Sequence, residues 1–242
     1  MDTQSFCDLF RIIFEKNQLT RFCSEPIMRQ FEAFTALLQE TNAHTNLTAI
    51  REVPEIIAKH YADCLLAEPF FRAGATVLDV GCGGGFPTVP LAIARPDLQI
   101  TALDSTAKKI DFVKNTAQQL HLHNIRPICA RAEDKAMAKY KGTFDVGTSR
   151  AVAKLSVLVE LILPYIKIGG SLIALKGAAG DEELRDAGKA IRILGGEIRE
   201  IRHILLSGCD KSENRTVIHI QKVVDTPPEF PRQYAAILKK PL

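Results

Sequence analysis

A glycine-rich segment at residues 79–87 carries the strongest chemical signal in the sequence. It reads Asp-Val-Gly-Cys-Gly-Gly-Gly-Phe-Pro and follows an apolar run that begins at Thr76. Glycines such as Gly81, Gly83 and Gly85 let a chain turn tightly and bring its backbone close to a ligand. A helix that begins after such a turn presents free N–H groups, which favour an anionic group. We therefore expect a small-molecule site where this strand meets the following helix.

Two classes of ligand use such a loop, and the side chains beside the glycines distinguish them. A dinucleotide fingerprint requires a third glycine at the position of Phe86. Asp79 stands two residues before Gly81, where its carboxylate would repel a diphosphate but attract the ammonium and sulfonium groups of S-adenosylmethionine. The pattern therefore favours a methyl donor over NAD, and an NAD-dependent oxidoreductase is the less favoured alternative.

A second carboxylate follows the next apolar run. Asp104 comes 19 residues after Gly85, close to the spacing at which an acidic residue accepts hydrogen bonds from ribose hydroxyls. Ser105 is expected to cap the helix that begins near residue 106 and to lie at the same ligand site. Because both ligand classes contain ribose, this feature does not separate NAD from the methyl donor.

Charged side chains also follow the third, fourth and fifth apolar runs. Glu133 follows the third and could accept a hydrogen bond from an adenine amino group. Arg150 and Lys176 follow the fourth and fifth. The carboxyl ends of parallel strands are where open α/β sheets bind ligands. We therefore assign Arg150 and Lys176 to substrate positioning, although each could equally be a surface charge.

The elements that position these residues alternate between strand and helix. Helical patterns lie near residues 87–95, 106–121, 155–167 and 181–194, between apolar runs. Such alternation predicts a parallel sheet with helices on both faces. The last two runs are separated only by the turn-rich loop 207–215, so they should be antiparallel neighbours. The seven runs are Thr76–Val80, Gln99–Leu103, Ile125–Cys129, Phe144–Thr148, Ser171–Leu175, Glu197–Leu206 and Thr216–Gln221.

The two ends of the chain differ from this α/β region. Apolar residues recur at helical spacing in residues 1–60, and a short helix is expected from Pro54 towards Leu66. From Asp225 onwards the sequence is Pro-rich and expected to be irregular. We predict three parts: a helical segment 1–73 packed on the core, a ligand-binding domain 74–224, and a basic tail 225–242.

Composition excludes several classes of protein. Hydrophobic residues make up 46% of the 242 residues and charged residues 24%, which is typical of a globular protein. No apolar run reaches the roughly 20 residues that span a bilayer, so we expect no membrane partner. The six cysteines show neither CxxC nor zinc-site spacing. We therefore expect no metal, reduced thiols and a cytoplasmic location.

The charge is small but unevenly distributed. The net charge is +3, yet residues 1–60 hold six Lys and Arg against eight Asp and Glu. Residues 108–141 hold eight basic residues and three acidic ones. Together with Arg232, Lys239 and Lys240, this basic region permits an RNA partner without establishing one. From charge alone, a solvated helix face is the simpler interpretation.

Further motifs resemble those of one family, the ribosomal RNA small-subunit methyltransferase G family, also called glucose-inhibited division protein B. The resemblance covers nearly the whole chain, and its combination of motifs is more specific than the glycine loop alone. The matching segments are Asn46-Leu47-Thr48, His60 with Asp63, DVGCGGGFP from Asp79, LDSTAKK from Leu103, RAE at 131–133, SRAVA from Ser149, LKG at 175–177, Arg215 with Lys222, FPR at 230–232 and the KxPL-like ending at Leu242.

The resemblance implies a fold, a reaction and a set of residues. The fold is the Rossmann-like seven-stranded sheet of class I methyltransferases, with its last strand antiparallel. Family members methylate N7 of one guanine in 16S rRNA, position 527 in the usual rRNA numbering, with S-adenosylmethionine as donor. The implied partner is the small ribosomal subunit, and we expect a monomer. Carried over by motif, the cofactor residues are Gly81, Phe86, Ala132, Glu133 and Arg150.

Three other features shape the expected substrate side. Asn46 could contact the edge of the target base. His60 and Asp63 stand one helical turn apart and are expected to pair with each other. The chain departs from the family pattern at Glu40-Thr41-Asn42, at Thr88 and at Gln233-Tyr234-Ala235. A methyltransferase acting on another RNA position or on a small molecule, and an RNA-binding protein without donor site, remain as alternatives.

Overall fold

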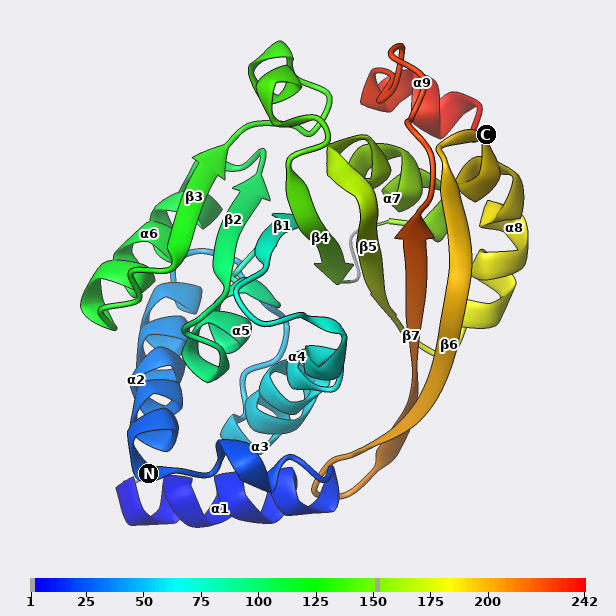
Figure 1. The fold of residues 1–242 in the computed structure, drawn as a ribbon. Coiled ribbons are helices and arrows are strands. Elements are labelled where there is room, and N and C mark those ends of the chain that lie inside the picture. Colours follow the sequence, from blue (N-terminus) through cyan, green and yellow to red (C-terminus); the bar gives the residue numbers. More distant parts are fainter. Residues whose placement is uncertain (1–2, 151–152) are drawn as a thin grey trace.

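The computed structural model describes residues 3–150 and 153–242. Within these ranges seven strands form one sheet in the order β3-β2-β1-β4-β5-β7-β6 (Figure 1). Strands β1 to β5 are parallel, and β7 runs antiparallel to both of its neighbours. This confirms the predicted fold. The strands are β1 Thr76–Val80, β2 Gln99–Asp104, β3 Ile125–Cys129, β4 Phe144–Arg150, β5 Ile166–Lys176, β6 Gly196–Ser207 and β7 Ser212–Lys222.

Helices cover both faces of the sheet because its central strands are apolar on both sides. Successive residues of β1 belong to different clusters: Val77 packs on one face with α5 and the N-terminal helices, and Leu78 on the other with α7 and α8. The helices of the α/β region are α5 Thr88–Ala94, α6 Ala107–Gln119, α7 Leu155–Ile162 and α8 Gly180–Ile193, with short 3-10 turns η4 Lys135–Tyr140 and η5 Leu163–Tyr165.

The N-terminal helices pack against the sheet through aromatic side chains. Phe10 stacks on Phe14 with ring centroids 3.7 Å apart, and Phe31 lies 5.2 Å from Phe10. These rings share one core cluster with Val77 of β1 and Ile173 of β5. The elements are α1 Thr3–Lys16, η1 Thr20–Phe22, α2 Glu25–Asn42, α3 Val53–Ile56, the π-helical turn η2 Ile57–Ala62, α4 Asp63–Leu65 and η3 Glu68–Phe70. The proposed boundaries near residues 73 and 224 remain a prediction.

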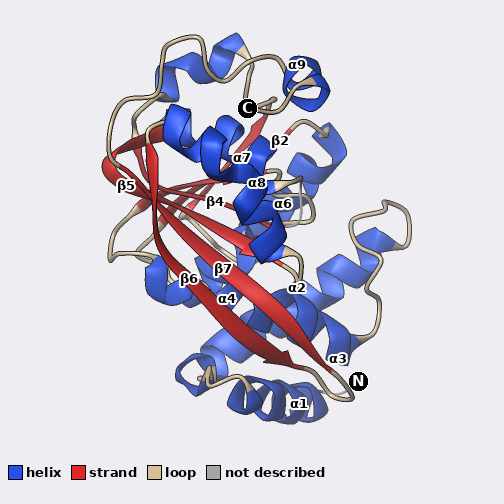
Figure 2. Ribbon diagram, turned by 90° about the vertical axis from the view of Figure 1, so that its right-hand side faces the viewer, coloured by secondary structure: helices blue, strands red, loops and turns tan. Residues whose placement is uncertain are grey.

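A long hairpin formed by β6 and β7 extends from the edge of the sheet to the N-terminal helix. Figure 2 shows it reaching down to α1. There the side-chain amide of Asn17 donates to the carbonyl of Ser207 at 2.8 Å, and its oxygen accepts the N–H of Ser207 at 2.8 Å. The strands continue to Ser207 and Ser212, so the connection is shorter than the predicted loop 207–215.

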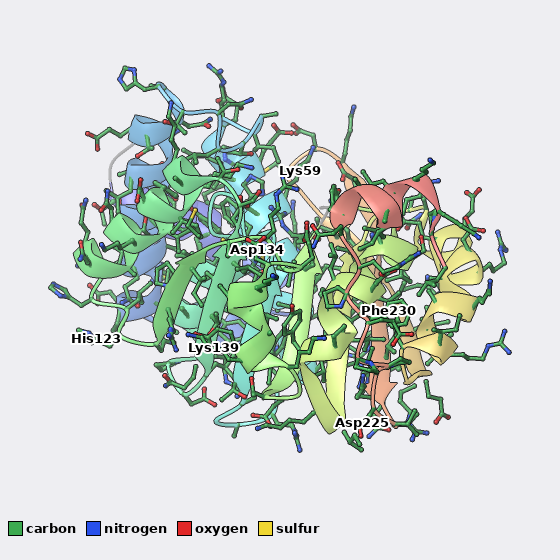
Figure 3. All side chains as sticks on the ribbon, turned by 90° about the horizontal axis from the view of Figure 1, so that it is seen from above. Lys59, His123, Asp134, Lys139, Asp225 and Phe230 are labelled. Carbon is green, nitrogen blue, oxygen red and sulfur yellow. The ribbon has the colours of Figure 1, made fainter. Side chains whose placement is uncertain are left out.

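The C-terminal segment is more ordered than predicted. Helix α9, Tyr234–Lys239, occupies part of the tail that was expected to be irregular, and Ile237 is fully buried. Phe230, labelled in Figure 3, is also buried. The prediction was wrong because Arg232 anchors the segment: its side chain donates to both carboxylate oxygens of Glu160, at 2.7 and 2.6 Å.

Candidate active site

The glycine loop joins β1 to α5 by a turn that only glycine adopts without strain. Gly81, Gly83 and Gly85 have φ angles of 76°, 55° and 88°, in the left-handed region that other residues rarely adopt. A Cβ at Gly85 would lie only 2.7 Å from Cγ2 of Val89 in α5. Glycine is thus required here for two local reasons, the turn itself and the close contact with the following helix.

The loop uses its own N–H groups within the protein. Gly81 and Cys82 donate to the carbonyl of Leu103 at 2.7 and 3.0 Å, and Gly85 donates to the carbonyl of Cys82 at 2.8 Å. The N–H of Gly83 donates to the carboxylate of Asp104 at 3.0 Å. Contrary to expectation, the loop is therefore not arranged as a cradle for an anion.

Asp79 is a fully buried carboxylate on the side of β1 that faces α5. Its Oδ2 accepts the hydroxyl of Thr88 at 2.6 Å, whereas its Oδ1 has no hydrogen-bond partner among the described residues. Burial raises the pKa of Asp79 to about 7. A buried acceptor without a donor fits an ammonium group, reached directly or through water. This observation fits the predicted methyl donor and disfavours a diphosphate.

A cavity of about 300 Å³ lies at the carboxyl ends of β1, β2 and β3. Gly81, Asp104 and Ser105 line it together with Arg131 and Glu133. The structure thus brings together predicted cofactor residues from three strand ends. Each oxygen of a carboxylate has two lone pairs. Asp104 can therefore accept ligand hydroxyls while it holds the loop.

The predicted helix cap was wrong. Thr106, not Ser105, stands at the N-cap position of α6, and its side chain makes no capping hydrogen bond. The N–H of Thr106 instead donates to Oδ1 of Asp104 at 2.9 Å. Asp104 therefore braces both the start of α6 and the glycine loop, which leaves Ser105 at the cavity wall.

The residues after β3 complete this cavity. Ala132 is buried, and its carbonyl accepts the hydroxyl of Tyr165. The side chain of Glu133 is 5% exposed, with the guanidinium of Arg131 3.8 Å away. Tyr234, at one of the departures from the family pattern, also lines the cavity. The C-terminal segment therefore closes one side of the predicted donor site.

A second cavity, of about 340 Å³, lies farther along the same edge of the sheet, at the ends of β4 and β5. Its wall carries four basic and two acidic side chains, and Glu55 and Glu183 pair with two of the basic ones from outside the wall. The wall residues are Lys59, Arg150, Lys176, Arg215, Asp63 and Glu213. We call it the basic pocket. A pocket rich in basic side chains beside a carboxylate-lined cavity suits a phosphate-bearing substrate next to a cationic donor.

Arg150 connects the basic pocket to the N-terminal helices. Its guanidinium donates to the carbonyl of Lys59 at 2.8 Å and to Oδ2 of Asp63 at 3.2 Å, and it lies 5.0 Å from the ring centroid of Phe86. The residues that follow it in the SRAVA motif, 151–152, lie outside the described residues. Arg150 therefore contacts Phe86 at this end of the glycine loop. Neither residue lines the carboxylate-lined cavity, the one that contains Asp104 and Glu133.

His60 and Asp63 do not pair in the predicted way. Asp63 accepts hydrogen bonds from Arg150 and, at 2.8 Å, from Nε of Arg215. The ring of His60 contacts Arg150 through Nδ1 at 2.9 Å and stacks on Phe86 at 4.2 Å. Burial and the nearby guanidinium of Arg150 lower the pKa of His60 to about 3. Arginines from two strands, β4 and β7, each bind one carboxylate oxygen of Asp63. The local spacing of His60 and Asp63 could not show this.

Lys176 and Asn46 lie in contrasting surroundings. The ammonium group of Lys176 is buried, paired with Glu183 of α8 at 2.7 Å and bonded to the carbonyl of Ala153. Asn46 is exposed, on the loop 43–52 between α2 and α3. Neither substrate role is tested by these positions, so both remain predictions.

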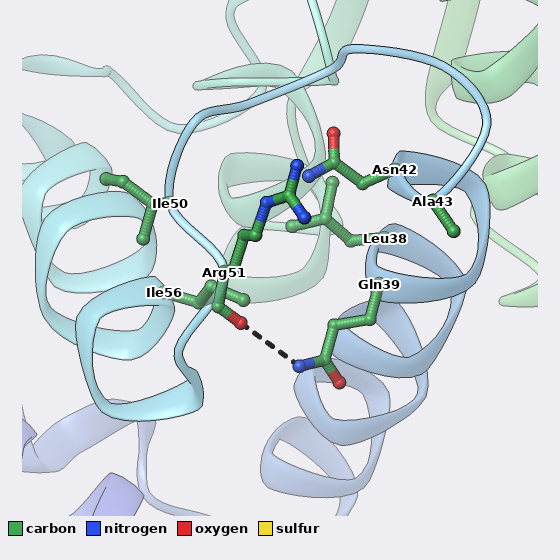
Figure 4. A pocket seen from close by; sticks show the side chains of 7 residues that line it. All are labelled: Leu38, Gln39, Asn42, Ala43, Ile50, Arg51 and Ile56. Carbon is green, nitrogen blue, oxygen red and sulfur yellow. Dashed lines mark hydrogen bonds between the residues drawn. The ribbon is translucent and has the colours of Figure 1, made fainter.

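A smaller hollow of about 200 Å³ lies where this loop returns to α2. Figure 4 shows its lining, with Nε2 of Gln39 donating to the carbonyl of Arg51 at 3.1 Å. Asn42, another departure from the family pattern, accepts the N–H groups of Leu47 and Thr48 at 2.8 and 3.0 Å. These amide side chains hold the middle of the loop and its end at Arg51 against α2.

The sequence also matches a known family. The model of rRNA small subunit methyltransferase G matches residues 27–210. A Ribosomal RNA small subunit methyltransferase G from Clostridium perfringens is 42% identical over 222 residues, covering 90% of this chain and 92% of the relative. The chain belongs to the rRNA small subunit methyltransferase G family. A relative of the same name from Lactobacillus acidophilus is 40% identical over 224 residues, with 90% and 92% of the two chains covered.

Solved structures show the same fold at low sequence identity. The [4+2]-cyclase SpnF has a TM-score of 0.54 at 17% identity, covering 81% of this chain and 94% of that one. A SAM-dependent methyltransferase from Aquifex aeolicus has a TM-score of 0.52 at 15% identity, covering 69% and 93%. The family and this class I methyltransferase fold confirm the prediction of S-adenosylmethionine as the cofactor.

Within this methyltransferase G family, sequence reasoning missed some of the side chains that complete the site. Thr88 was noted only as a departure from the family pattern, yet its hydroxyl is a partner of Asp79. Arg215 was noted only as part of a motif, yet it lines the basic pocket. The sequence signal for Thr88 was its position at the start of α5, nine residues after a buried carboxylate.

Asp79 should make donor binding depend on pH. A bound cation favours the ionised form of a carboxylate whose pKa is otherwise about 7. Ionisation of Asp79 must then accompany binding, so affinity rises with pH. We expect S-adenosylmethionine to bind about tenfold more tightly at pH 7 than at pH 5.5, with release of a proton. Calorimetry in two buffers of different ionisation enthalpy measures both quantities. Asp79→Asn should flatten the profile, and an unchanged slope in that variant would contradict the assignment.

Across residues 3–150 and 153–242, no helix is both long and apolar enough to cross a membrane. In the same ranges, no group of three or more His, Cys, Asp or Glu is arranged to hold a metal ion.

Proposed function

We propose that this chain transfers the methyl group of S-adenosylmethionine to N7 of guanine 527 in 16S rRNA, acting in the cytoplasm as a monomer. Membership of the rRNA small subunit methyltransferase G family supports the substrate class. The observation that carries the proposal is the pairing of two unlike cavities at one sheet edge. One is lined by Asp104 and Glu133, and the other holds four basic side chains.

The two cavities suit the two substrates. Asp104 would hold the ribose hydroxyls, and Glu133 the adenine amino group, in the first cavity. Asp79 would balance the positive charge of the donor below the glycine loop. In the basic pocket, Arg150, Lys176 and Arg215 would hold the guanine O6 or neighbouring phosphates, with Asn46 at the base edge.

The chemistry requires positioning more than proton transfer. S-adenosylmethionine supplies the methyl group as an electrophile when it is bound. Guanine N7 already carries a lone pair, so no side chain must remove a proton. The protein must hold N7 in line with the methyl group at about 3–3.5 Å. Because positive charge develops on guanine, a lysine beside N7 would oppose the reaction. We therefore place the basic side chains on O6 and phosphate.

Methylation of small ribosomal subunits that lack the modification tests this function. With labelled S-adenosylmethionine, we expect label on one guanine, cleavable as N7-methylguanine, at position 527. Donor binding without label on RNA would retain a methyltransferase and exclude the RNA target. Label at another nucleotide would retain the substrate class and exclude the position.

Lys176→Ala provides a sharper test of the basic pocket. We expect the single-turnover rate on small subunits to fall about tenfold, because a charge-assisted hydrogen bond to the substrate is lost. Donor affinity should be unchanged. Lys189→Ala, at an exposed position on α8, is the matched control and should retain the full rate. An unchanged rate in folded Lys176→Ala would show that this side chain only pairs with Glu183.

A further inference from the structure

The loop 43–52, which we call the NLT loop, lies directly against the glycine loop. A Cβ built on Gly84 would lie 3.3 Å from Cβ of Leu47 and 3.5 Å from its carbonyl oxygen. This spacing leaves little room between the two backbones. The loop that carries Asn46 is therefore seated on the same turn that lines the predicted donor site.

His60 forms a second connection between the two loops. Its ring stacks on Phe86, with the two ring planes 24° apart. On its other edge, Nε2 lies 2.8 Å from the hydroxyl oxygen of Thr48 in the NLT loop. His60 thus contacts Phe86 of the glycine loop and Thr48 near the middle of the NLT loop.

The direction of these hydrogen bonds follows from the donors available. A guanidinium group only donates, so the contact between Arg150 and Nδ1 of His60 requires an unprotonated Nδ1. A neutral imidazole then carries its hydrogen on Nε2. His60 must therefore donate to the hydroxyl oxygen of Thr48, which also accepts the N–H of Ile50 at 3.1 Å. The two hydrogen bonds therefore run in one direction, from Arg150 to His60 and from His60 to Thr48. We call this chain of hydrogen bonds the relay.

This relay serves neither acid–base chemistry nor direct binding. His60 is 5% exposed, and neither the carboxylate-lined cavity nor the basic pocket includes it in its wall. Its two nitrogens are both engaged within the protein. His60 instead joins three parts of the proposed site: Phe86 of the glycine loop, Arg150 of the basic pocket and the NLT loop that carries Asn46.

We propose that His60 is a positioning residue that couples occupation of the donor site to the placement of the NLT loop for RNA. The proposal rests on the function proposed above and adds a regulation of that site. A bound donor stabilises the glycine loop, and Phe86 and Gly84 then support His60 and Leu47. The NLT loop is then held more firmly through the hydroxyl of Thr48. Linkage requires the reverse effect as well, so RNA bound at the NLT loop strengthens donor binding.

Amide hydrogen exchange of residues 43–52, with and without saturating S-adenosylmethionine, tests this coupling. In the wild type we expect the donor to slow exchange about fivefold or more, within the usual range of coupling between sites. Thr48→Val keeps the shape of the side chain but loses the acceptor, so the donor should no longer slow exchange. Thr48→Ser restores the hydroxyl and should restore the effect.

Thr45→Val is the matched control, because Thr45 lies in the same loop and outside the relay. It should retain the donor-dependent protection. His60→Phe keeps an aromatic ring beside Phe86 and removes both nitrogens, so it should behave like Thr48→Val. In methylation assays on small subunits, Thr48→Val should raise KM about tenfold with little change in donor affinity, as expected for one lost hydrogen bond.

Each outcome decides the proposal. Protection that is equal in Thr48→Val and wild type overturns it, and so does a wild type in which the donor leaves exchange of the NLT loop unchanged. Donor-dependent protection that only the hydroxyl variants retain supports it. If that protection is present but no guanine is methylated, the coupling proposal is retained and the proposed RNA target is excluded.

Discussion

Asp104→Ala is expected to weaken binding of S-adenosylmethionine about 100-fold, because two charge-assisted hydrogen bonds to the ligand are lost. The same carboxylate holds the N–H groups of Gly83 and Thr106, at 3.0 and 2.9 Å. Its removal therefore takes away both the proposed ribose acceptor and the brace of the glycine loop. Isothermal calorimetry gives the dissociation constant, and methylation at limiting donor should fall in parallel.

Two further variants separate these contributions. Asp104→Asn keeps one acceptor oxygen and should lose less affinity than Asp104→Ala. Asp111→Ala removes an exposed carboxylate from α6 and should bind the donor like the wild type. If Asp104→Ala remained folded and bound within threefold of the wild type, the assignment of Asp104 to ribose would be wrong.

Arg232→Met is expected to give the largest loss of stability. Glu160 is 0% exposed, and Arg232 donates three hydrogen bonds to its carboxylate, from the backbone N–H at 3.0 Å and from the guanidinium at 2.7 and 2.6 Å. Removing the guanidinium leaves a buried charge without a countercharge, held only by the backbone N–H of residue 232, and breaking a buried ion pair typically costs about 3–5 kcal/mol. Urea denaturation followed by circular dichroism measures the free energy of unfolding.

The double variant Glu160→Leu with Arg232→Met provides the control for that interpretation. With the buried charge removed as well, most of the stability should return, since apolar replacements of buried ion pairs are often neutral. Arg29→Met breaks an ion pair between exposed side chains and should leave the unfolding transition unchanged. A single Arg232→Met variant as stable as the wild type would contradict the assigned role of this anchor.

The strands and the antiparallel pairing of the last two followed from local patterns. Each central strand of the sheet is an apolar run bounded by turn residues, and the loops after β1 and β2 carry the glycines and Asp104. Such features depend on neighbours within a few residues, so periodicity and turn chemistry reveal them. The carboxylate-lined cavity was predictable because parallel strands end at a common edge.

The basic pocket was less predictable because distant pairings form it. Asp63 and Arg215 are 152 residues apart in sequence and 2.8 Å apart in space. Glu183 of α8 pairs with the ammonium group of Lys176, a contact that the sequence did not reveal, and the predicted substrate role of Lys176 remains a prediction. Similarly, α9 forms in a Pro-rich tail because Arg232 reaches Glu160. None of these contacts leaves a periodic trace in the sequence.

The place of β7 in the sheet bears on how the chain is made. Strand β6 is synthesised before β7, yet among the described strands it pairs with β7 alone, which inserts between β5 and β6. A growing chain that ends before Ser212 therefore has no partner for β6. Asn17, between α1 and η1, is made early, but its hydrogen-bond partner Ser207 lies at the tip of this hairpin and is made much later. The contact between α1 and the hairpin can consequently form only after strands β1 to β5 have emerged from the ribosome, whereas the aromatic contacts of α1 with α2 do not depend on β7.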